Sequence, residues 1–127
     1  MEPTRKALAA QGVYYVATGI APFTSRRAFE AATGPKREWW LVQTVGVLVT
    51  TVGAGLLSAA ARNRVTPDLV SIAGGCAAGL ATIDVVYVIR RRIAPTYLAD
   101  AAVEIALLVG HAAAMRAHAR ADGHAAA

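Results

Sequence analysis

Charged residues are scarce in this sequence, and they are unevenly spread. Only 17% of the 127 residues are charged, against about 25% in ordinary soluble domains. Residues 39–61 and 69–83 contain no Asp, Glu, Lys or Arg, and residues 101–114 contain only Glu104. A soluble helix of that length normally shows a polar face. The sequence therefore predicts an all-α integral membrane protein, and the alternative is an Ala-rich soluble bundle that hides its apolar faces by oligomerising.

Cysteine is nearly absent, and no cofactor motif is present. The single cysteine, Cys76, excludes an intrachain disulfide and a thiolate metal cluster. The three histidines all fall at or beyond the end of the last apolar run, and we expect neither a metal site nor a cofactor. A net charge of +5 would suggest nucleic-acid binding in a soluble domain. Here the Lys and Arg residues lie in short segments between apolar runs, as membrane topology requires. We therefore expect the lipid bilayer as a partner and no nucleic acid.

Four apolar runs divide the chain, which we expect to form one domain over residues 1–127. The expected spans cover about residues 7–23, 39–61, 69–89 and 96–115. About 20 residues suffice to cross a hydrocarbon core of about 30 Å, so the uncharged run 39–61 is the most secure. The run 7–23 is the weakest, because it contains several polar residues. A cleaved signal peptide has a similar layout, but this run lacks a Leu-rich centre, which favours a retained helix. The sequence thus predicts a four-helix up-down bundle.

The connecting segments carry their own signals. Residues 24–38 mix Arg, Glu and Phe, which is typical of a short interfacial helix. The run Thr66-Pro67-Asp68 predicts a helix start, with Thr66 as the N-cap. Residues 116–127 are expected to be a flexible tail. The N-terminus, second connection and tail carry six Lys and Arg, and the first and third connections carry seven. Because the latter are denser, we expect the first and third connections on the cytoplasmic side of the cell membrane.

Three carboxylates lie within or beside the last two apolar runs. Asp84 precedes Arg90 by six residues, which places it about 9 Å inside its span. Asp100 and Glu104 are spaced i, i+4 and share a helix face. An ionisable residue in a membrane segment is costly and is by default a functional-site candidate. The short turn between the two spans predicts that these faces meet in a carboxylate-lined pocket in one half of the bundle. One alternative is that the acids pair with nearby arginines and only fix the helix register. Another is that the helix boundary lies elsewhere and leaves Asp100 in solvent.

Three functional hypotheses follow. The first is a membrane protein that binds or moves a small polar or cationic molecule, or protons. The second is a structural subunit that assembles with itself or a partner through small-residue faces. The third is a membrane isomerase-like enzyme that uses the acids for proton transfer, and it is less favoured than a non-enzymatic role. The candidate ligand-binding residues are Asp84, Tyr87, Tyr97, Asp100, Glu104, Arg27, Glu30, Lys36 and Gln43, and the helix-packing residues are Gly46, Gly53, Gly75 and Gly79.

Two motifs carry a resemblance to known proteins. They are RAFE with TGPK in residues 27–36, and IDVVY in residues 83–87 followed by Tyr97, Asp100 and Glu104. Over residues 14–104 the chain resembles a group of small bacterial four-span membrane proteins, which implies the four-span fold and no activity. In architecture alone it is similar to the sigma-2 receptor and sterol isomerase superfamily, whose four-span bundles hold a carboxylate-lined pocket. No motif is shared with that superfamily, so the likeness implies no functional residue here.

Overall fold

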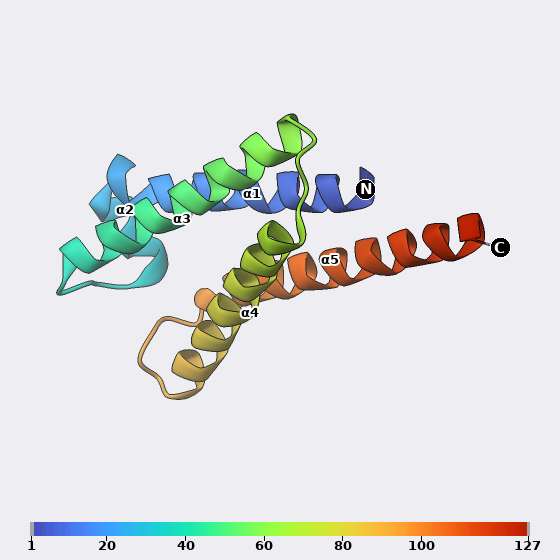
Figure 1. The fold of residues 1–127 in the computed structure, drawn as a ribbon. Helices are drawn as coiled ribbons and strands as arrows, with labels where there is room; N and C mark the ends of the chain where they lie inside the picture. The colour runs from blue at the N-terminus through green and yellow to red at the C-terminus, as the bar shows by residue number, and fades with distance from the viewer. Residues whose placement is uncertain (1, 127) are drawn as a thin grey trace.

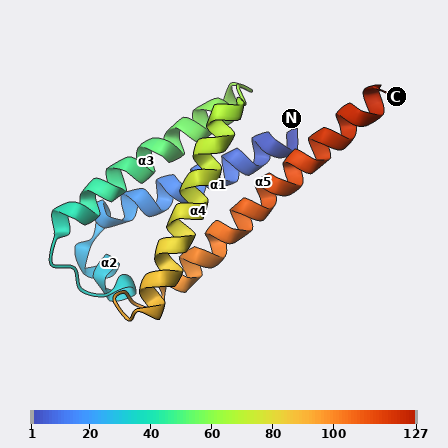
Figure 2. The ribbon, with the colours of Figure 1, turned by 60° about the horizontal axis from the view of Figure 1, so that its bottom comes forward.

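A computed structural model describes residues 2–126, and over that range the regular structure is entirely helical. Figure 1 shows the five helices. Four are long: α1 (Glu2–Thr24), α3 (Trp39–Ala61), α4 (Pro67–Ile89) and α5 (Tyr97–Ala126). The fifth, α2 (Arg26–Thr33), is a short helix in the first connection. The long helices alternate in direction, so both termini lie at one end and α2 lies with the α4–α5 connection at the other (Figures 1 and 2).

Helix α1 is the centre of the arrangement, although its sequence is the least typical of a membrane span. It packs along α3 over most of its length, and it also contacts α5 and, more weakly, α4. Helices α4 and α5 form a second antiparallel pair. In contrast, α3 and α4 scarcely touch, although they are consecutive in the chain. The four long helices therefore form two pairs joined through α1 and α5, open between α3 and α4.

Glycines allow α1 and α3 to approach backbone to backbone. A Cβ atom at Gly53 would lie 2.8 Å from the backbone N of Val16, and one at Gly46 would lie 2.7 Å from the carbonyl O of Gly19. Gly12 is equally tight against α3. Only glycine fits such contacts without displacing a helix. Gly46 and Gly53, two of the expected packing residues, therefore face α1 of the same chain.

The glycines of α4 are placed differently. Within the described chain, a Cβ atom at Gly75 or Gly79 would meet nothing within 4 Å. Both residues are exposed on the outer side of α4. The face that they form is therefore unused by the described part of the chain.

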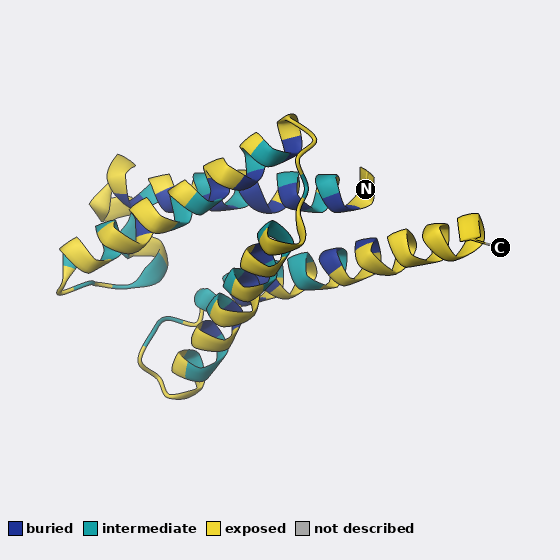
Figure 3. Ribbon diagram, viewed as in Figure 1, coloured by how far each residue is buried: buried dark blue, intermediate teal, exposed yellow. Residues whose placement is uncertain are grey.

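Much of the outer surface is apolar. Figure 3 shows that the turns facing outward on the long helices are mostly exposed, and large side chains such as Leu48 and Val109 are more than 60% exposed. A water-soluble monomer rarely exposes such extended apolar surface. Three helices, α3, α4 and α5, are long and apolar enough to cross a membrane. These features support a multi-pass membrane protein.

The helix ends agree with the sequence in one place and differ in another. The Thr66 hydroxyl accepts a hydrogen bond from the backbone N of Leu69 at 3.3 Å, and Pro67 opens α4, which confirms the predicted start. The expected flexible tail is instead helical as far as Ala126. Alanine has the highest helix propensity, and His118 Nε2 lies 3.3 Å from Asp122 Oδ2 one turn later, a spacing that supports a helix.

Candidate functional site

A cavity of about 600 Å³ lies between the helices at the α2 end of the molecule. All five helices contribute to its wall. Its acidic residues are Asp84 from α4 and Asp100 and Glu104 from α5. Among the described residues that line it there is no Lys, Arg or His. The cavity is therefore acidic, and the rest of its wall is mainly apolar. We refer to it below as the acidic cavity.

Two tyrosines of α1 bind two of these acids. The hydroxyl of Tyr15 donates a hydrogen bond to Oε2 of Glu104 at 2.8 Å, and both residues are only 1% exposed. The hydroxyl of the adjacent Tyr14 donates to Oδ1 of Asp100. The two rings are tilted by 50° with centroids 6.3 Å apart, so neighbouring residues reach different turns of α5. Helix α1 thus supplies donors to the acids of α5.

The third acid has an unused oxygen. Asp84 is 5% exposed, lines the acidic cavity and lies near the carboxyl of Asp100. Its Oδ2 is buried and has no hydrogen-bond partner among the described residues. Leaving a buried acceptor unsatisfied costs about 1–3 kcal/mol, and more if it is charged. The wall therefore presents an acceptor that a bound donor would satisfy.

A second polar layer lies further along the bundle. Gln11 is fully buried, and its side-chain nitrogen donates to the carbonyl O of Ala73 at 2.8 Å. Its Oε1 lies 2.7 Å from Nε2 of His111. Because an amide oxygen only accepts, Nε2 of His111 carries the proton in this contact. The layer ties α1 to α4 and α5, about 10 Å beyond Glu104 along α5.

The other end of the acidic cavity is covered by contacts between α2 and the α4–α5 connection. The hydroxyl of Thr96 donates to the carbonyl O of Ala32 at 2.7 Å. The ammonium of Lys36 lies 5.2 Å from the centroid of the Tyr97 ring and donates to the carbonyl O of Thr33. We call these contacts of residues 32–36 with residues 96–97 the end clasp.

Arginine holds α2 in place next to the end clasp. Nε of Arg26 donates to Oε1 of Glu30 at 2.9 Å, and its guanidinium lies 4.8 Å from the centroid of the Trp39 ring. Phe29 packs edge-on against the same ring. The hydrogen bond from Arg26 lowers the pKa of Glu30 below its ordinary value. Glu30 therefore stays ionised and paired at neutral pH.

The structure divides the candidate residues into two groups. Asp84, Tyr97, Asp100 and Glu104 line the acidic cavity together. The remaining candidates lie outside its lining: Tyr87, Arg27, Glu30, Lys36 and Gln43. Tyr87 lies instead beneath the guanidinium of Arg90, which is 5.9 Å from its ring centroid. Within the described range, the ion pairs of the chain join other acids, and none involves an acid of the cavity.

Sequence reasoning gave no definite role to four residues that the structure places in or beside the site. They are Tyr14, Tyr15, Gln11 and His111. The apolar run 7–23 does contain a pattern that indicates an inward face. Gln11 and Tyr15 are spaced i, i+4 on the face that also carries Gly12 and Gly19. Polar residues and glycines on one helical face mark a face turned toward other helices.

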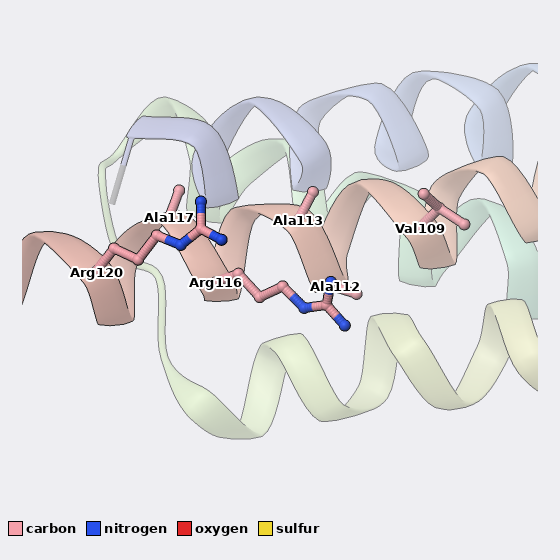
Figure 4. A pocket seen from close by; sticks show the side chains of 6 residues that line it. All are labelled: Val109, Ala112, Ala113, Arg116, Ala117 and Arg120. Carbon is pink, nitrogen blue, oxygen red and sulfur yellow. The ribbon is translucent and has the colours of Figure 1, made fainter.

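A second hollow, of about 430 Å³, runs along α5 on the terminal side of the molecule (Figure 4). All six lining residues belong to α5, and the polar ones are Arg116 and Arg120. A surface formed by a single helix encloses little, and it has no acid. We therefore place the candidate functional site at the acidic cavity.

Comparison of the chain with protein families, curated proteins and solved structures finds no match.

Proposed function

We propose that this protein is a four-span membrane protein that binds, or moves, a small organic cation in the acidic cavity. The observation that carries the proposal is Asp84, buried at the wall with an oxygen that no described residue satisfies. An ammonium group would supply both a positive charge and N–H donors. Hydrogen bonds to charged groups contribute about 1.5–3 kcal/mol each.

Helix α1 supplies the fourth span in this proposal. Its uncharged part, residues 7–24, extends about 27 Å, which is close to a hydrocarbon core of about 30 Å. Its polar groups Gln11 and Tyr15 are buried and hydrogen-bonded inside the bundle. On its outer side Val13 and Ile20 are exposed. Its low hydropathy therefore comes in part from polar residues that face other helices, and in part from the charged residues Glu2, Arg5 and Lys6 at its start. We place the α2 end on the cytoplasmic side, following the denser Lys and Arg there.

The absence of cations from the cavity wall separates this proposal from a purely structural role for the acids. A structural role would lead us to expect an arginine at the acids, since breaking or omitting one partner of a buried pair is costly. In the described chain two basic residues at this end have other partners: Lys36 donates to the carbonyl O of Thr33, and Arg26 pairs with Glu30. In the described chain, the hydroxyls of Tyr14 and Tyr15 donate to the acids of α5, and the carboxyl of Asp84 lies near that of Asp100. This arrangement leaves the acids of the cavity without a cationic partner among the described residues, which an ammonium ligand would supply.

The experiment compares neutralised variants in lipid nanodiscs. Equilibrium binding of radiolabelled hexylammonium is measured for the wild type, Asp84→Asn, Asp100→Asn and Glu104→Gln. Loss of a charged hydrogen bond of 1.5–3 kcal/mol predicts about 10- to 150-fold weaker binding for Asp84→Asn. The control is Asp122→Asn, whose carboxyl is exposed near the C-terminal end of α5. Unchanged binding in all three folded variants would refute the proposal. The proposal would also be refuted if the variants failed to fold and the wild type bound no hexylammonium.

A second candidate function is assembly through the face of α4 that carries Gly75 and Gly79. The specific observation is that this face is unused within the described chain, whereas the glycines of α3 contact α1. Leucine at Gly75 or Gly79 should then reduce oligomer size on detergent chromatography. Gly55→Leu is the matched control, because Gly55 also has open space around it but lies on α3. Unchanged oligomer size in the α4 variants would exclude this role for the face.

A further inference from the structure

We infer that the acidic cavity is reached from the lipid, between α3 and α4, and that its ligand is an amphipathic amine with an ammonium head and an aliphatic chain. This inference rests on the proposed function and names the ligand class and the access route. Asp84 supplies the binding point for the head, because it is 5% exposed and its Oδ2 has no hydrogen-bond partner among the described residues. The apolar parts of the same wall supply the surface for the chain.

The acidic cavity opens between α3 and α4. Helices α3 and α4 scarcely touch, yet both line the acidic cavity. Three of the lining residues are also about half exposed: Leu41 (46%) and Val45 (52%) on α3, and Ile83 (52%) on α4. Lining residues with this much exposure mark the place where the cavity is open, and we call them its rim. Because Ile83 directly precedes Asp84, the rim lies close to the unpartnered acid.

Both ends of the acidic cavity are covered by contacts between helices and connections. At the α2 end, the end clasp joins the two connections through the hydrogen bond from Thr96 to Ala32 and the stacking of Lys36 over Tyr97. Further along the bundle, the layer of Gln11 and His111 ties α1 to α4 and α5. Contacts therefore cover both ends, and the side rimmed by apolar residues stays open.

Polar and apolar residues lie on different sides of the cavity wall. The acids come from α4 and α5, whereas α3 contributes Leu41, Val42, Val45, Gly46 and Val49 to the wall. A small inorganic cation would leave this apolar side without a partner. A purely apolar molecule would leave Asp84 Oδ2 unsatisfied. An amine with a chain matches both sides, with the head at the acids and the chain along α3 toward the rim.

The rim can be tested by narrowing it. Association of dodecylammonium with the protein in zwitterionic nanodiscs is followed by stopped-flow tryptophan fluorescence for Val45→Trp and Ile83→Trp. The matched control is Val47→Trp, because Val47 is 53% exposed on α3 and does not line the cavity. We expect association at least about tenfold slower in the rim variants than in the control. Equal rates in all three variants would overturn lipid access.

A second measurement uses the wild-type protein, so it does not depend on the folding of a variant. Dodecylammonium with a diazirine at the end of its chain is photolysed in the nanodisc, and labelled residues are mapped by mass spectrometry. Competition by unlabelled dodecylammonium identifies site-specific labelling. We expect specific labels in residues 41–49 and 80–83. Specific labels confined to the end clasp would overturn the access route and leave the proposed function intact. The absence of any specific label, together with no hexylammonium binding, would refute the proposed function as well.

Discussion

Replacing Gly53 by alanine should weaken the packing of α1 on α3. The added Cβ would lie 2.8 Å from the backbone N of Val16 and 2.9 Å from the carbonyl O of Gly12. Both atoms belong to the backbone, so no side-chain rotation can relieve the contact. Overpacking of this kind costs about 1–3 kcal/mol, and rigid neighbours place Gly53→Ala in the upper part of that range. The matched control is Gly55→Ala, whose Cβ would meet nothing within 4 Å. Alanine also has the higher helix propensity, and that gain is common to both variants.

The difference in free energy of unfolding between the two variants is therefore expected to be about 2–3 kcal/mol, or about 30- to 150-fold in the unfolding equilibrium. Unfolding in mixed micelles of mild detergent and sodium dodecyl sulfate, followed by circular dichroism, measures this difference. Gly55→Ala should match or exceed the stability of the wild type. Equal stability of Gly53→Ala and Gly55→Ala would mean that α1 does not lie against α3 at Gly53. The central position of α1 in the fold would then be wrong.

Three further predictions address single contacts. Tyr15→Phe should lower the free energy of unfolding by about 1–3 kcal/mol in the same assay, because Glu104 Oε2 loses a buried donor; no loss would mean that this hydrogen bond is absent. Thr66→Ala should cost about 1 kcal/mol through loss of the N-cap of α4, and an unchanged stability would contradict the cap. The pKa of Glu30 is lowered in the fold, so its ion pair with Arg26 stabilises the folded state at pH values above the ordinary carboxyl pKa. That contribution is lost as the pH falls through the lowered pKa of Glu30. Carbon-13 NMR titration should show the Glu30 midpoint rising in Arg26→Ala, and identical midpoints would contradict the pairing.

The sequence predicted the apolar helices well because their signals are local. The run 39–61 coincides with α3, and the expected third span differs from α4 by only two residues at its start. Long uncharged runs and a Thr-Pro-Asp helix start leave few alternatives to a helix. The i, i+4 spacing of Asp100 and Glu104 also placed both on one face, and the structure turns that face to the same cavity as Asp84.

The partners of the acids could not be predicted in the same way. Tyr14 and Tyr15 lie more than eighty residues away in the sequence, and their contacts depend on where α1 packs. The short connections favour α3 and α4 as neighbours, yet glycines at the α1–α3 contact allow a close approach that makes α1 central. Arg27 and Lys36 were expected at the pocket because of their charge. Local contacts within the first connection hold Lys36 instead, and Arg27 is exposed.

The most direct test of the acidic cavity compares an amine with the neutral alcohol of equal chain length. Binding of decylammonium and of decanol is measured in nanodiscs for the wild type and for Asp84→Asn, so that chain partitioning is common to both ligands. The wild type should prefer the amine by about 10- to 150-fold, and Asp84→Asn should lose most of that preference. If the wild type binds the alcohol as tightly as the amine, or if the preference survives in Asp84→Asn, the acidic cavity is not a cation site.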